Sequence, residues 1–174
     1  MSYSAASLRS LALVIGLGLA TLGFGAAGAL AAEEVNIVDG YAIHGYDAVA
    51  YFTKGEPTEG KDEFVAEHDG ARYRFASAGN RDAFRADPAK YAPQYGGFCA
   101  YGTAQGRKVD GDPEARSIVD GKLYLNINRK VHSLWNEDTA GYIRGSNHNW
   151  PIIEAIPDSD LADSPPETIT LGAQ

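Results

Sequence analysis

The stretch YRFASAGNRDAFRADPAKY, residues 73–91, contains the strongest local signals in this chain. Its first residues alternate aromatic and basic side chains, which is typical of a β-strand with one buried face. Ser77 is a good helix N-cap, and the helix that follows it carries an apolar stripe at Ala83 and Phe84. Pro88 ends or restarts this helix. The stretch therefore predicts a strand that turns into a helix at Ser77.

The residues before this stretch predict a β-hairpin. The segment EFVAEHDG, residues 63–70, also alternates and ends in an Asp-Gly pair, which favours a tight hairpin turn. Tyr73 and Phe75 would then share one face of the hairpin, with two arginines on the other. A second Asp-Gly pair, at residues 120–121, predicts a second hairpin in the segment ARSIVDGKLYLNIN, residues 115–128.

The remaining segments complete a predicted α+β fold, in which C-terminal helices extend the two hairpins. Residues 128–150 are expected to be helical after a cap at Asn128, with a second short helix over about 137–144. The segment GGFCAYG, residues 96–102, predicts a tight buried segment in which backbone approaches backbone. The segment DAVAYF, residues 47–52, predicts either a short helix capped by Asp47 or a buried strand. No internal repeat is apparent.

The two ends of the chain predict an exported protein with a disordered tail. One cation, Arg9, precedes an uncharged run that ends in small residues, which predicts a signal peptide over 1–31. The run is long enough to span a bilayer, so a retained anchor is the alternative. After cleavage we expect a periplasmic or secreted protein with no membrane contact. The last residues, 157–174, are acidic and contain proline, which predicts disorder.

The charge of the chain limits its partners. The formal net charge is -8 and becomes -9 when Arg9 is removed with the signal peptide. An acidic protein lacks the basic face that nucleic acids require, and it is repelled by anionic lipids. The sequence identifies no protein partner.

Residues 45–91 resemble the YHS domain, a small module related to the metal-sensing TRASH-type domains. The matching segments are GYDAVAYF and YRFASAGNRDAFRADPAKY, and the whole chain resembles exported bacterial proteins that carry this domain. The resemblance implies a YHS core over about 45–91, within a single domain over 32–156. It also implies three metal-binding cysteines, whose positions fall here on Ala50, Ala76 and Asn80. Alanine has no ligand atom and asparagine is a poor ligand for copper or zinc, so the usual site is absent.

Cys99 is the only cysteine, so it forms no internal disulfide and is buried, ligated or available to another thiol. As a soft ligand it would suit copper or another transition metal such as zinc, with His44 as the first candidate partner. The alternative is that Cys99 is a small buried apolar residue and that His44 bonds to backbone in a polar turn.

The other candidate residues carry weaker signals. His68 is expected to be exposed, His132 either packs or functions, and His148 is expected on a loop. The alternating acids of DGDPE, residues 110–114, suggest calcium, but the distal glutamate of a helix–loop–helix site is missing. No catalytic motif is present. We therefore expect a non-enzymatic binding protein; a metal-free scaffold or protein-interaction module is the alternative.

Overall fold

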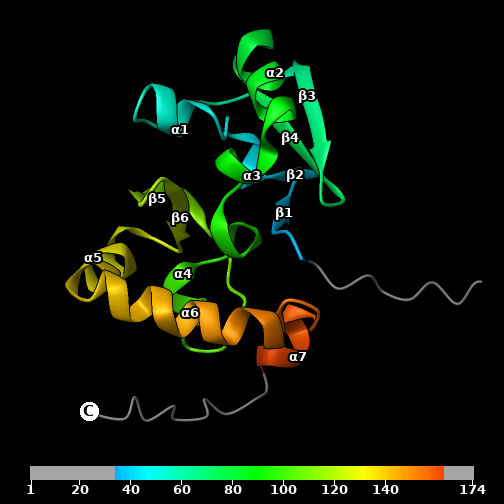
Figure 1. Ribbon diagram of the computed structural model, residues 1–174. Helices are drawn as coiled ribbons and strands as arrows, with labels where there is room; N and C mark the ends of the chain where they lie inside the picture. The colour runs from blue at the N-terminus through cyan, green and yellow to red at the C-terminus, as the bar shows by residue number, and fades with distance from the viewer. Residues whose placement is uncertain (1–33, 163–174) are drawn as a thin grey trace, which may run out of the picture.

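The computed structural model describes residues 34–162. Within this range short antiparallel hairpins alternate with helices, which confirms the predicted α+β fold. The elements form two hairpin–helix units, the first over residues 37–91 and the second over residues 94–153. Figure 1 shows the first unit above the second. The predicted signal peptide, residues 1–31, lies outside the described residues.

The first unit is built around the predicted hairpin and helix. The hairpin turns at Asp69-Gly70, where both residues have positive φ, and the helix begins after Ser77, whose Oγ accepts from the Asn80 N–H at 3.2 Å. A new short helix restarts at Pro88. The elements of this unit are β1 (Ile37–Val38), β2 (Tyr41–Ala42), η1 (Ile43–Gly45), α1 (Ala50–Thr53), β3 (Lys61–His68), β4 (Ala71–Phe75), α2 (Ala78–Ala86) and α3 (Pro88–Tyr91).

The second unit also contains a hairpin followed by helices. Asn128 caps its first long helix as predicted, with Oδ1 accepting from the Val131 N–H at 2.9 Å. The expected second short helix is longer, and it includes His148, which was expected on a loop. The elements are η2 (Gln94–Gly97), α4 (Ala100–Ala104), β5 (Asp112–Val119), β6 (Lys122–Asn126), α5 (Arg129–Glu137) and α6 (Thr139–Ile153), and α7 (Asp158–Ala162) follows them.

The second unit repeats the first, although no repeat is apparent in the sequence. β3 begins at Lys61 and β5 at Asp112, while α2 begins at Ala78 and α5 at Arg129, a spacing of 51 residues in both cases. Both hairpins also shift register near their start. Three consecutive residues with positive φ precede each unit's first α-helix, over 43–45 and 95–97. The fold is therefore a structural duplication of one hairpin–helix unit.

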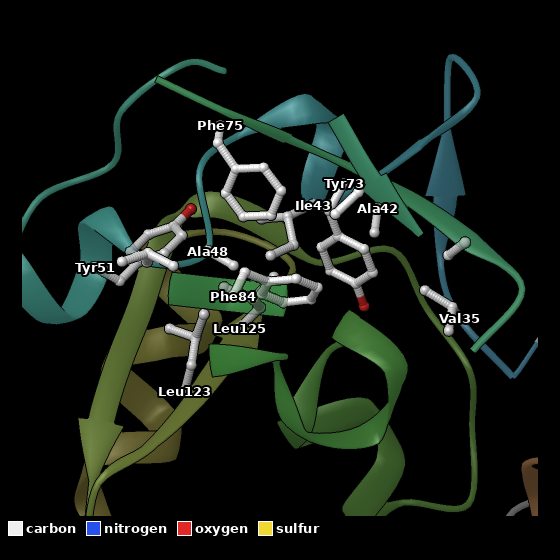
Figure 2. Close-up of a cluster of buried hydrophobic side chains, with 13 residues drawn as sticks. Val35, Ala42, Ile43, Ala48, Tyr51, Tyr73, Phe75, Phe84, Leu123 and Leu125 are labelled. Carbon is white, nitrogen blue, oxygen red and sulfur yellow. The ribbon is translucent and has the colours of Figure 1, made fainter. Parts of the chain in front are cut away.

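The described residues form two hydrophobic cores, and strand β6 contributes side chains to both of them. Neighbouring residues of a strand point to opposite faces. Leu123 and Leu125 therefore enter the first core, whereas Tyr124 enters the second. Figure 2 shows the two leucines beside Phe84 of the first unit. The large side chains of the first core are Ile43, Val49, Tyr51, Tyr73, Phe75, Phe84, Leu123 and Leu125; those of the second are Tyr95, Tyr124 and Trp135.

Two further predictions concern the backbone at Gly96 and the tail. Gly96 has φ 59°, and a Cβ there would overlap the Glu34 carbonyl, which confirms the predicted close backbone approach. The start of the segment predicted to be disordered instead forms α7, because Leu161 is buried against the domain. Residues 163–174 lie outside the described range. Among residues 34–162, no helix is long and apolar enough to cross a membrane.

Candidate functional site

A buried carboxylate organises the corner where β4 turns into α2. Asp47 has 0% exposure. Its Oδ1 accepts from the backbone N–H groups of Val49 at 2.9 Å and Ala50 at 3.1 Å. Its Oδ2 accepts from the Ala76 N–H at 2.8 Å and from the Asn80 side-chain amide at 2.6 Å. These charge-assisted hydrogen bonds compensate for removing the carboxylate from water. We call this group, Asp47 with Ala50, Ala76 and Asn80, the Asp47 corner.

The Asp47 corner occupies the place of the implied metal site. Three of its four hydrogen-bond donors come from Ala50, Ala76 and Asn80, the positions to which the resemblance assigns thiols. Both carboxylate oxygens already accept two hydrogen bonds each, and neither alanine carries a ligand atom. The residues present therefore do not fit a soft transition metal, which requires thiolate or imidazole donors here.

One family model matches the chain over the range that contains this corner. The YHS domain model matches residues 49–95, a range that includes Ala50, Ala76 and Asn80. The chain contains a YHS domain. The YHS match ends where the second unit begins, so the duplicated unit is an extension of the YHS domain. No curated protein and no solved structure matches the chain significantly.

Cys99 lies in the second unit, outside the matched range of the YHS domain. Its side chain is buried, its thiol donates to Asn126 Oδ1 at 3.8 Å, and its sulfur accepts from the Gly102 N–H at 3.4 Å. Burial raises the pKa of the thiol, and nearby backbone N–H groups lower it by less. Burial therefore favours the neutral thiol of Cys99 in the metal-free protein.

Cys99 is the structural counterpart of Asp47. Asp47 accepts from the N–H of Ala50, three residues later, and Cys99 accepts from the N–H of Gly102, also three residues later. The backbone N–H of Ile127, the counterpart of Ala76, also lowers the pKa of the thiol. Cys99 thus matches the carboxylate of the first corner and none of its thiol positions. Cys99 follows Asp47 by 52 residues, close to the repeat length of the two units, and this spacing is the sequence signal that could have identified Cys99 as the counterpart of Asp47.

His44 has a partner other than Cys99. Its Nε2 lies 2.8 Å from Asp110 Oδ1, which also accepts from Asn36 Nδ2 at 2.5 Å. Among residues 34–162, no three side chains of the metal-ligating types form a group that could hold an ion. The pairing of Cys99 with His44 as metal ligands stays a prediction.

The weaker candidates also have structural roles. Asp112 Oδ1 accepts from the Glu114 N–H at 2.8 Å, as expected for a turn. His68, expected to be exposed, is partly buried with its ring 5.9 Å from that of Phe84. His148 is exposed on α6. His132 is the exception, because its ring contacts the hydroxyl of Ser117 at 2.8 Å, a pair that sequence analysis did not find.

The burial of Cys99 predicts a slow reaction with thiol reagents. In the native protein we expect the aromatic disulfide DTNB to modify Cys99 at a rate limited by unfolding, because the thiol is protonated and only 1% exposed. In guanidinium chloride the same sample should release one thiol per chain at once. Rapid modification without denaturant, or a Cys99-linked dimer on a non-reducing gel, would contradict this environment.

Proposed function

We propose that this protein is an exported, non-enzymatic binding protein that uses the YHS fold as a metal-free scaffold. The Asp47 corner is the observation that carries the proposal. Its carboxylate joins the loop before α1 to the β4–α2 corner, which brings together the segments whose thiols would otherwise share a metal. The hydrogen bonds of one aspartate thus replace the structural contribution of a metal ion.

The second unit supports the same proposal. The residues of this unit that correspond to Ala76 and Asn80 are Ile127 and Val131, which have no ligand atoms. The bond between His44 and Asp110 and the burial of Cys99 also support the scaffold over copper or zinc binding through Cys99 and His44. The predicted signal peptide supports an exported location.

Metal analysis of the mature protein tests this proposal. After growth in medium supplemented with copper and zinc, we expect substoichiometric metal in the wild-type protein, in Cys99→Ser and in His44→Ala. A variant that carries Ala50→Cys, Ala76→Cys and Asn80→Cys should bind a soft metal ion, because three thiolates then meet at one corner. Circular dichroism before and after chelation controls for folding of this variant.

The opposite result is equally specific. One metal ion per wild-type chain, lost in both Cys99→Ser and His44→Ala, would overturn the metal-free scaffold and establish the Cys99–His44 site.

A further inference from the structure

A pocket of about 270 Å³ opens where α1 of the first unit approaches β5 of the second. Neighbouring residues of a strand point to opposite faces, so Arg116 and Ile118 lie on the face of β5 that they share with Leu123 and Leu125, toward the first unit, whereas the Ser117 side chain points to α5. The lining residues are Tyr51, Gly55, Arg116, Ser117 and Ile118. The pocket exists because the two units are joined, so neither unit would form it alone.

Arg116 brings a positive charge into this pocket. Its guanidinium donates to the Gly55 carbonyl at 2.5 Å, and no carboxylate among residues 34–162 forms an ion pair with it. By contrast, Arg74 and Arg81 pair with aspartates at 2.8 Å. A guanidinium presents a planar set of N–H donors that matches a carboxylate in two parallel hydrogen bonds. Arg116 therefore retains donors and a charge for an anion in the pocket.

Behind the pocket, on the opposite face of β5, Ser117 contacts His132 on α5. Ser117 Oγ lies 2.8 Å from His132 Nε2, and the Asn136 side-chain nitrogen lies 3.4 Å from the same ring nitrogen.

We propose that this pocket binds a small organic carboxylate, whose charge pairs with Arg116 while Ile118 and Tyr51 cover its apolar body. This inference assigns a ligand class to the binding function proposed above and rests on it. The pocket contains none of the three thiol positions, so the two proposals fail in different experiments.

The proton on His132 provides a second readout. Burial lowers the pKa of His132, and the charge of Arg116 lowers it further. Arg116 on β5 is the charged group that acts on the His132 ring. The ring also contacts three neutral side chains, which are Ser117, Asn136 and Trp135. A bound carboxylate offsets the charge of Arg116, so the pKa of His132 rises. Protonated His132 then donates to Ser117 Oγ, and binding tightens as the pH falls.

NMR titration of the mature protein with butyrate tests the inference. We expect saturable shifts of the Ser117 and Ile118 amide signals and a rise in the measured pKa of His132. Arg116→Gln should weaken binding by about tenfold or more, because it removes a charged hydrogen-bond partner. Arg129→Gln is the matched control, since it makes the same charge change at a side chain that is 82% exposed, and it should bind like wild type.

Three results would overturn the inference: no saturable shift with butyrate, equal affinity in Arg116→Gln, or equal affinity for inorganic phosphate, which has no apolar body. Arg116→Lys covers the case in which Arg116→Gln fails to fold. It keeps the charge but loses the planar set of donors, so it should bind butyrate more weakly than the wild-type protein, and wild-type affinity would count against a paired contact with Arg116. A failed titration would leave the metal-free scaffold standing, because metal content tests that separately.

Discussion

Replacing Asp47 with alanine is expected to lower the free energy of unfolding by about 3 kcal/mol or more, because each buried donor left without an acceptor costs about 1–3 kcal/mol. The variant removes the acceptor of the Val49 and Ala76 N–H groups and of the Asn80 amide at once, and it leaves the Ala50 N–H only the backbone carbonyl of residue 47. Urea unfolding followed by circular dichroism measures the change.

Two further variants separate the role of Asp47 from a general effect of charge. Asp47→Asn keeps the shape but places an NH₂ group opposite N–H donors, so it should also destabilise. Asp82→Asn removes a carboxylate that is 61% exposed and pairs with its neighbour Arg81, so it should cost no more than about 0.5 kcal/mol. If Asp47→Ala cost as little as Asp82→Asn, the Asp47 corner would not be what holds the two segments together.

The YHS stretch on its own, residues 34–95, is expected to remain unfolded. Leu123 and Leu125 come from the second unit but are fully buried in the first core. Burying a leucine contributes about 1.5–3 kcal/mol, and a domain of about 60 residues is already marginal, so losing both leucines removes most of its stability. Circular dichroism and the dispersion of amide NMR signals measure this. A dispersed spectrum with cooperative unfolding would mean that the units are independent.

A point variant tests the same contact in the full chain. Leu125→Ala should cost about 2–5 kcal/mol because it leaves a cavity in the first core. Unfolding should remain a single transition, since β6 belongs to both cores. Ile152→Ala is the control, because Ile152 is 60% exposed and its truncation should change stability by no more than about 0.5 kcal/mol.

The local features of this fold were predictable from the sequence. Both hairpins turn at Asp-Gly pairs, and Ser77 and Asn128 cap the helices that follow. These signals act between residues at most a few positions apart, so the residue types alone select the conformation. The absence of thiols from Ala50, Ala76 and Asn80 could likewise be read from the sequence. The sequence did not indicate that the carboxylate of Asp47 holds this corner in place of a metal ion.

The tertiary structure decided the features that depend on distant segments. Asp47 bonds to Ala76 and Asn80, which are 29 and 33 residues away. Ser117 on β5 likewise contacts His132 on α5. Sequence analysis also missed the duplication, because the core residues differ between the units, with Phe84 in one and Trp135 at the equivalent position of the other. Apolar packing tolerates such exchanges as long as volume and pattern are kept. The sequence by itself therefore determined the turns, the caps and the missing thiols, and the chain's tertiary contacts determined the Asp47 corner, the shared core and the pocket.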